Sequence, residues 1–248
     1  MRVLAHISDL HFGTEIPTMV RTLKEDLEKL HPDVIAVSGD LSQRARESQF
    51  LAARRFLNEL PFPQVIVPGN HDIPLFNLPV RLLNPLGRYR KHISWDLAQT
   101  FVDSEVAVFG FNTVRPGKWK SGHLGESELK RLRTFLGSAN RKLFKVVVTH
   151  HPLVPFRARK VFSVLSDGGA DLVLAGHLHR GVHGRAGLRR RILFAEAGTA
   201  VSTRARNEVN GYNVVTVSDD RVVVQIRAWD GKGFHAGRSI TYPRASCI

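Results

Sequence analysis

Five short motifs rich in Asp, Asn and His lie between residues 9 and 179 of this 248-residue chain, each after an apolar run of β character. They are Asp9-Leu10-His11, Gly39-Asp40, Gly69-Asn70-His71-Asp72, His150-His151 and His177-Leu178-His179. In α/β proteins, functional sites form beyond the carboxyl ends of the strands. We therefore expect these side chains to converge in one cleft.

Metal binding is the chemistry that suits these side chains. Clustering Asp and His without a partner costs folding free energy, and a cation at the centre removes that cost. Imidazole, carboxylate and carboxamide ligands without a thiolate suit Mn, Fe, Zn or Co. Residues i and i+2 of a strand share a face, so Asp9 would point with His11, and His177 with His179.

The elements that must position these residues alternate along the chain. The apolar patterns predict strands at 3–8, 33–40, 64–72, 105–113, 144–152 and 171–179, and helices near 16–30, 45–60, 126–136 and 159–166. The last third is all-β, with an apolar run at 190–200 and a hairpin over 211–229 that turns at Ser218 to Arg221. No repeat or linker interrupts the pattern, so residues 1–248 are expected to form a single domain.

The segment 73–103 breaks the alternation, because it contains three prolines and a basic, aromatic-bearing stretch at 86–95. Long connections of weak periodicity are often binding loops or caps, and Tyr89 and Trp95 would offer rings on which a base could stack. An irregular helical excursion packed on the flank is an equally good interpretation.

Composition restricts the class of protein. Lys and Arg number 36 against 22 Asp and Glu, a formal charge of +14, and a single cysteine, Cys247, excludes an intramolecular disulfide. One cysteine and the lack of a signal-peptide pattern predict a cytoplasmic location. The charge suits an anionic membrane surface, nucleic acid or an anionic small molecule, or it reflects a general preference for Arg. Basic clusters lie at 130–133, 157–160, 189–191 and 204–206, and the oligomeric state cannot be inferred.

The ordered set D-x-H, GD, GNHD, H and GHLH resembles the calcineurin-like metallophosphoesterases. The resemblance implies an α/β fold, a four-layer αββα sandwich of two mixed β-sheets flanked by helices. Within that family the chain looks most like the bacterial class III cyclic-nucleotide phosphodiesterases. This finer likeness depends on the NHDIP turn, GFNT at 110–113, THHP at 149–152 and AGTAVSTR at 197–204.

The resemblance also implies a role for each motif residue. Two ions (Mn²⁺, Fe²⁺/Fe³⁺ or Zn²⁺) would be held, the first by Asp9, His11 and His179, the second by Asn70, His150 and His177, with Asp40 bridging both. A hydroxide bridging the metals would attack phosphorus in line. His71 would contact the phosphate or protonate the leaving group, oriented by Asp72. The substrate would meet Asn70, His71, His151, Asn112 and Arg204.

Several of these residues have a second interpretation. Asn112 could serve ordinary turn chemistry, and Arg204 and Arg206 could lie in a solvated loop. His6 falls on the opposite strand face from Asp9 and is expected to be a core residue. Five other histidines have no partner at ligand spacing and are predicted not to be ligands: His31, His92, His123, His183 and His235. Gly39, Gly69 and Gly176 are expected to let the backbone turn sharply beside the ligands.

The function that follows from the resemblance is hydrolysis of a cyclic nucleotide or a similar small phosphodiester. Two enzymatic alternatives are a pyrophosphatase acting on a nucleotide-diphosphate lipid of the UDP-diacylglucosamine type, and a nuclease. Pyrophosphatases of lipid A synthesis in this superfamily tend to carry Arg where this chain has His71, which argues against the first. A retromer-subunit-like scaffold would have lost its ligands, and here the set is intact.

Overall fold

The computed structural model describes residues 1–117, 122–153, 159–186, 192–206 and 208–244. Within them, six strands form a first sheet: β1 (Arg2–Ile7), β2 (Val34–Val37), β3 (Gln64–Ile66), β10 (Gly211–Val217), β11 (Arg221–Trp229) and β12 (Phe234–Pro243). Six more form a second sheet: β4 (Thr100–Val102), β5 (Val106–Gly110), β6 (Phe144–Val148), β7 (Leu172–Ala175), β8 (Val182–Ala186) and β9 (Ile192–Glu196). The spatial orders are β12-β11-β10-β1-β2-β3 and β4-β5-β6-β7-β9-β8.

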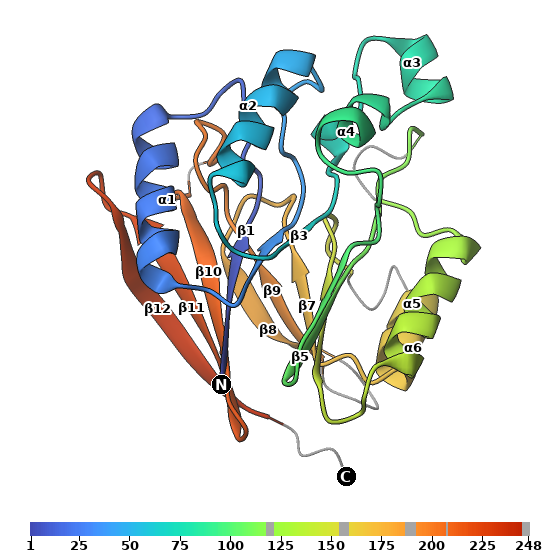
Figure 1. Cartoon of the computed structure of the whole chain (residues 1–248), viewed down its shortest axis with the longest axis vertical. Coiled ribbons are helices and arrows are strands. Elements are labelled where there is room, and N and C mark those ends of the chain that lie inside the picture. Colours follow the sequence, from blue (N-terminus) through green and yellow to red (C-terminus); the bar gives the residue numbers. More distant parts are fainter. Residues whose placement is uncertain (118–121, 154–158, 187–191, 207, 245–248) are drawn as a thin grey trace.

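The helices of the described residues flank these sheets (Figure 1). They are α1 (Pro17–Leu30), α2 (Glu47–Asn58), α3 (Leu78–Leu83), α4 (Gly87–His92), α5 (Glu126–Ser138) and α6 (Arg159–Asp167), with one 3₁₀ turn at Asn70–Asp72. Helices α1 and α2 lie outside the first sheet, and α5 and α6 lie outside the second.

Strand alternation explains the layers. In β1, Ala5 and Ile7 belong to the apolar cluster shared with α1 and α2, whereas Leu4 points the other way and packs between the two sheets. The inter-sheet cluster unites valines and leucines of β1, β2 and β3 with those of β5, β6 and β7. The order of layers is helix, sheet, sheet, helix, which confirms the predicted αββα fold.

The parallel strands direct their carboxyl ends to one edge of the molecule. Strands β1, β2 and β3 are mutually parallel, as are β5, β6, β7 and β9. Strand β1 begins at the end marked N in Figure 1 and runs upward, so the loops that follow these strands gather at the opposite end. Backbone hydrogen bonds join loops that follow neighbouring strands, from the Asp9 amide to the Gly39 carbonyl (3.1 Å) and from the Gly176 amide to the His150 carbonyl (3.0 Å).

The predicted strands and helices are present, but several strands are shorter than predicted. The strand predicted at 64–72 ends at Ile66, and Asn70–Asp72 form the 3₁₀ turn. Strand β1 ends at Ile7, so Asp9 and His11 lie beyond it. Strands β4, β8 and β12 were not predicted: β4 has three residues, and most side chains of β12 are exposed, so neither shows an apolar alternation.

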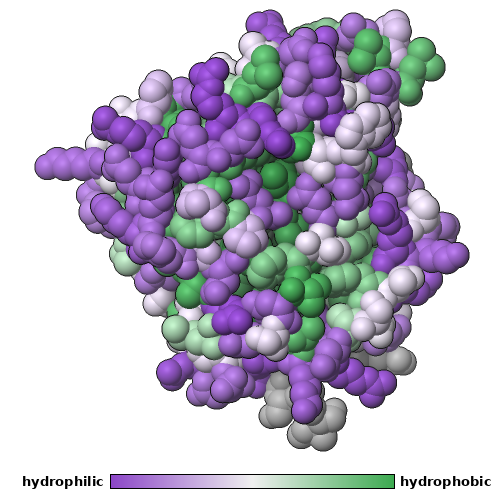
Figure 2. Space-filling model, in the orientation of Figure 1, coloured by the Kyte–Doolittle hydropathy of each residue, from purple (hydrophilic) through white to green (hydrophobic). Residues whose placement is uncertain are grey.

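The segment 73–103 contains α3, α4 and the edge strand β4. Helix α4 packs on α2, and Leu86, Tyr89 and Ile93 join the core beneath α1 and α2, as in the helical interpretation. Tyr89 is fully buried, so it cannot stack on a base as predicted. Helix α3 buries none of its residues. Figure 2 shows apolar side chains protruding at the corner of the molecule where Figure 1 places α3.

The basic clusters are only partly described. Lys130, Arg131 and Arg133 lie on the exposed face of α5, while residues 157–158 and 189–191, and also Cys247, lie outside the described residues. Among the residues that the structure describes, no helix is long and apolar enough to cross a membrane.

His6 is a buried polar link between strands of the first sheet. Its Nε2 lies 2.9 Å from Ser38 Oγ, and its Nδ1 lies 3.3 Å from Asn213 Nδ2 of β10. Burial lowers the pKa of His6 to about 3. The ring is therefore neutral in the folded protein near neutral pH, as expected of a core residue.

We predict that His6→Gln makes stability less dependent on pH. Between pH 6.5 and about 3 the unfolded chain binds a proton at His6 and the folded protein does not, so acid lowers the free energy of unfolding. Without the His6 imidazole, the free energy of unfolding should fall less steeply as the pH is lowered, and the two slopes should differ by ~1.4 kcal/mol per pH unit. Urea unfolding of both proteins with chelator present measures the slopes, and parallel slopes would contradict the assignment.

Candidate metal centre

The predicted ligands lie in loops beyond the strand ends, in an unusual backbone conformation. Among the described residues, eight non-glycine residues have positive φ, and five of them are predicted ligands: Asp9 (52°), His11 (47°), Asp40 (53°), His177 (73°) and His179 (58°). Such conformations are sparsely populated and concentrate at functional sites. Left-handed turns, rather than alternation along a strand, therefore bring Asp9 beside His11 and orient His177 and His179.

The first donor group consists of Asp9, His11 and His179, all buried. Asp9 Oδ1 lies 3.6 Å from His11 Nε2 and 3.5 Å from His179 Nε2. The Nδ1 of His179 meets Thr199 Oγ1 at 2.6 Å, which orients the ring so that Nε2 faces the carboxylate. These are the three residues expected around the first metal.

The second donor group consists of Asn70, His150 and His177. Asn70 Oδ1 lies 3.0 Å from His150 Nε2 and 2.9 Å from His177 Nδ1. His151 also lies near this group, since its ligand atom is within 4.8 Å of those of His150 and His177. Both of these adjacent histidines follow the end of β6 at Val148, so strand alternation does not send their side chains to opposite faces.

Asp40 lies between the two donor groups. Its Oδ2 is 3.7 Å from His11 Nε2, and its Oδ1 is 3.4 Å from His150 Nε2. Oδ1 also accepts a hydrogen bond from the His71 amide at 2.8 Å, which fixes the carboxylate. One side chain thus reaches a nitrogen of each group.

The hydrogen bonding of these residues is incomplete without a cation. His150 Nδ1 donates to the Ser38 carbonyl at 2.8 Å, and burial lowers the pKa of His150 well below its usual value. A neutral ring with a proton on Nδ1 turns the Nε2 lone pair toward the Asp40 carboxylate. Within the described chain, Asp9 Oδ1 and both ring nitrogens of His11 are buried and make no hydrogen bond.

Electrostatics point the same way. Burial and the charge of Asp9 raise the pKa of Asp40 well above its usual value. Burial also lowers the pKa of His179 to about 4, so this ring does not supply a positive charge at neutral pH. A cation between the groups would neutralise the carboxylates and accept the imidazole lone pairs. The donor set fits metal ions in both positions.

His71 and Asp72 lie on the 3₁₀ turn beside Asp40 but have separate partners. His71 Nδ1 contacts the Gln43 carbonyl at 2.9 Å. The Asp72 carboxylate instead accepts bonds from the amides of Gly69, Leu41 and Ser42 and from the Ser42 hydroxyl. Asp72 thus fastens the loop after β2 to the turn after β3, and Gln43 has the orienting role that was expected of Asp72.

The other predicted substrate residues, His151, Asn112 and Arg204, have different surroundings. His151 Nδ1 meets Thr113 Oγ1 at 2.8 Å, and Asn112 Oδ1 accepts from the Val114 amide, as in an ordinary turn. Arg204 is half-buried, and its Nε makes no hydrogen bond within the described residues. The charges of Asp40 and Asp9 both act on Arg204, so its guanidinium is near the donor groups.

Sequence reasoning missed the groups that orient the rings. Carbonyls of Ser38 and Gln43 hold His150 and His71, and such backbone acceptors leave no signal in residue type. Thr199 lies in the AGTAVSTR motif, but its role in orienting His179 was not predicted. None of the five histidines predicted as non-ligands belongs to a metal-competent group in the described chain, where these groups use Asp9, His11, Asp40, His150, His151, His177 and His179.

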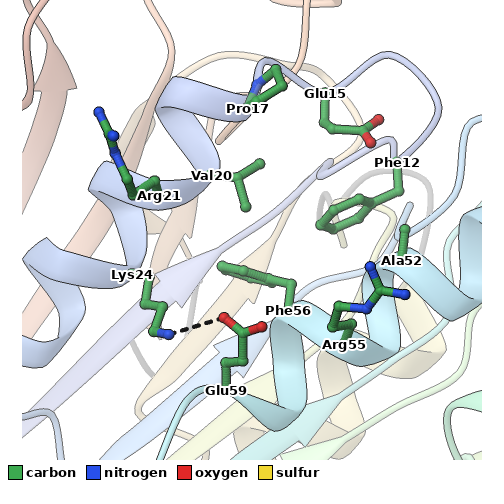
Figure 3. Close-up of a pocket in the computed structure, with 10 residues that line it drawn as sticks. All are labelled: Phe12, Glu15, Pro17, Val20, Arg21, Lys24, Ala52, Arg55, Phe56 and Glu59. Atoms are coloured by element: carbon green, nitrogen blue, oxygen red, sulfur yellow. Dashed lines mark hydrogen bonds and ion pairs between the residues drawn. The ribbon is translucent and has the colours of Figure 1, made fainter.

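A separate hollow of about 360 Å³ lies between α1 and α2 (Figure 3). Its aromatic floor is Phe12 and Phe56, and an ion pair between Lys24 and Glu59 (2.9 Å) closes one side. None of its lining residues belongs to the donor groups, so this hollow is not the candidate metal centre.

Comparison with known proteins agrees with this geometry. The family model described as "Calcineurin-like phosphoesterase" matches residues 2–181, more than half of the chain. The chain therefore belongs to the calcineurin-like phosphoesterase family, and its membership supports a metal-dependent hydrolase acting on phosphoric esters.

Two relatives carry more specific names. A glycerophosphodiester phosphodiesterase, GpdQ, of Enterobacter lignolyticus is 26% identical over 69% of this chain, and the match spans 64% of that relative, less than two thirds of its length. A probable cyclic nucleotide phosphodiesterase of Vesicomyosocius okutanii is 23% identical over 71% of this chain and 75% of its own. The crystal structure of a dimetal phosphatase from Danio rerio has the same fold, with a TM-score of 0.66 at 15% identity over 97% of this chain and 98% of that one.

We predict that Gly69→Ala disrupts the centre without unfolding the protein. Gly69 is extended rather than turned, and a Cβ there would overlap the Asp40 carboxylate and backbone amide. Displacing Asp40 should lower Mn²⁺ affinity and reduce phosphodiester turnover by ~10²-fold or more. Titration calorimetry and steady-state kinetics measure the two effects.

The matched control is Gly137→Ala in α5, where a Cβ meets nothing within 4 Å. This change should raise the free energy of unfolding by ~0.5–1 kcal/mol, because alanine favours a helix interior. It should leave metal affinity unchanged. Equal metal affinity in the Gly69 variant and the wild type would show that Asp40 does not depend on this close approach.

Proposed function

We propose that the chain hydrolyses phosphodiesters at a centre of two metal ions held by the two donor groups and shared by Asp40. The observation that supports this most directly is the reach of Asp40, whose two oxygens face His11 and His150. A carboxylate that faces both donor groups would help to hold both ions. When bound, Mn, Fe or Zn ions supply Lewis acidity and lower the pKa of the attacking water.

The chain's own residues prepare the donors. The Ser38 carbonyl and the Thr199 hydroxyl hold Nδ1 of His150 and His179, which leaves each Nε2 lone pair toward the centre. Asp9 Oδ2 accepts hydrogen bonds from the His177 amide at 3.0 Å and from the Ser8 hydroxyl at 2.6 Å. Oδ1 therefore remains to bind a metal ion. Such outer contacts orient ligands and tune their basicity.

His71 is proposed to contact the phosphate or protonate the leaving group. Burial lowers the pKa of His71 to about 3, so the ring is neutral in the free protein at neutral pH. Its Nδ1 is engaged by the Gln43 carbonyl, and Nε2 is the atom that can carry a second proton. An anionic phosphodiester beside Nε2 favours that proton, so the role requires bound substrate.

Arg204 is proposed as the cation that meets the phosphate from outside the metal centre. Its partly buried guanidinium has a donor without a hydrogen bond in the described chain, and an anionic ester oxygen would satisfy it. His151 and Asn112, which follow strands of the second sheet, and Asn70 of the 3₁₀ turn are kept as proposed substrate contacts. Asp72 positions the turn that carries His71.

The proposed substrate is a small phosphodiester, with cyclic nucleotides as the preferred class. One relative is named for cyclic nucleotides and the other for glycerophosphodiesters, and a diester is common to both names. Residues 1–248 are proposed to act as one domain, with 73–103 as its substrate cap. Trp95, 80% exposed, remains the ring in this cap on which a base could stack.

We predict a preference for diesters over monoesters. With added Mn²⁺, the wild type should hydrolyse bis-p-nitrophenyl phosphate faster than p-nitrophenyl phosphate and should cleave cyclic AMP. The same panel contains a nucleotide-diphosphate lipid and single-stranded DNA. Cleavage of the lipid alone would replace the proposal by the pyrophosphatase, and cleavage of DNA alone by the nuclease.

We also predict that His71→Ala retains bound metal and loses turnover by ~10²–10⁴-fold on a substrate with a poor leaving group, if the ring is a general acid. The defect should shrink for p-nitrophenolate, which needs little protonation. Elemental analysis checks the metal, and kcat for the two substrates separates the roles. An equal defect with both would assign His71 to phosphate binding instead.

A further inference from the structure

Helix α3 is a mostly apolar helix with no buried residue in the described structure. Five of its six residues are apolar and none is buried. Four side chains in this part of the chain are largely exposed: Phe76 (83%), Leu78 (62%), Leu82 (68%) and Leu83 (87%). We call these four residues the cap tip. Contiguous exposed apolar groups of this kind mark an interaction surface more often than isolated ones do.

The cap tip is held in place rather than loosely attached. The Arg81 guanidinium donates to the Pro116 carbonyl from Nε (2.9 Å) and Nη2 (2.6 Å), and the Asn77 side chain caps the helix by accepting from the Val80 amide. Behind it, α4 is anchored by the buried Tyr89. The structure therefore presents the apolar side chains outward on a fixed support.

The surroundings of the cap tip are cationic. Residues 73–95 contain Arg81, Arg88, Arg90 and Lys91 and no Asp or Glu. Arg44 also lies over the Phe76 ring, with its Cζ 5.9 Å from the ring centre. Of these cations, Lys91 forms an ion pair with Glu47 at 2.7 Å. An apolar projection with arginines at its base matches the interface of an anionic bilayer, where apolar groups enter the acyl boundary and cations meet the headgroups.

We propose that the cap tip docks the protein on anionic lipid surfaces. A second copy of the chain is a poorer occupant, because a symmetric contact would bring both sets of arginines together. The cap tip lies at the end of the molecule where the loops after β1 and β3 gather, so docking places the candidate metal centre close to the lipid surface (Figures 1 and 2). The proposal concerns this surface and does not depend on the phosphodiesterase assignment.

The test is sedimentation with vesicles of phosphatidylglycerol and phosphatidylcholine, compared with phosphatidylcholine alone. Wild type should bind the anionic vesicles, and added salt should weaken that binding. Leu82→Gln with Leu83→Gln should reduce the partition coefficient about tenfold or more, because two buried apolar side chains are lost from the lipid. Val102→Gln is the matched control, since Val102 is 55% exposed on the edge strand β4, which follows α3 and α4 in the chain and contains none of the cap-tip residues.

Melting temperatures of all variants should match that of the wild type, because the replaced side chains are exposed. Equal vesicle binding by the double variant and by Val102→Gln would overturn the proposal. So would a wild type that is dimeric by ultracentrifugation, binds no vesicles and becomes monomeric in the double variant, which would assign the cap tip to a second copy. Equal binding to neutral and anionic vesicles would refute the role of the arginines.

Discussion

Two carboxylates and several neutral imidazoles are buried within a few ångströms of one another, and the structure around them depends on how that concentration of lone pairs is neutralised. Asp9 and Asp40 are both inaccessible to water. Burial pushes Asp40 toward its protonated form and His150 toward its neutral form. Such a set is costly in a low-dielectric interior unless cations share it. Metal binding at this centre would therefore contribute to the stability of the fold as well as to catalysis.

The two sheets position these carboxylates and imidazoles, because the residues follow strand ends that meet at one edge. Five of the predicted ligands adopt left-handed backbone conformations, each of which costs free energy and persists where the surrounding structure enforces it. The surroundings here are backbone bonds between loops of neighbouring strands and the close approach of Gly69 to Asp40. Ring orientation is enforced from behind, by Ser38, Thr199 and Gln43.

Apolar periods predicted the alternating strands and helices, and the polar residues at the strand ends predicted a metal site. The αββα layers followed from the resemblance to the calcineurin-like metallophosphoesterases. Neither the patterns nor the resemblance predicted how the ligands meet. Alternation along a strand was the expected cause for Asp9 and His11, yet both lie past Ile7 in left-handed turns. Tyr89 was predicted to be a surface ring but is a core residue. Helix α4, with six residues in a proline-rich segment, is too short to show an apolar period. The exposed strand β12 had no apolar alternation to find.

The central claim is that two cations share Asp40. Titration calorimetry of Mn²⁺ into chelator-treated protein tests it most directly, with Asp40→Asn beside the wild type and Asp219→Asn, in the exposed turn before β11, as the control. The account predicts two equivalents bound by the wild type and the control, and fewer than two by Asp40→Asn, whose amide cannot serve two ions as a carboxylate does. A single equivalent in the wild type, or two undiminished equivalents in Asp40→Asn, would contradict it.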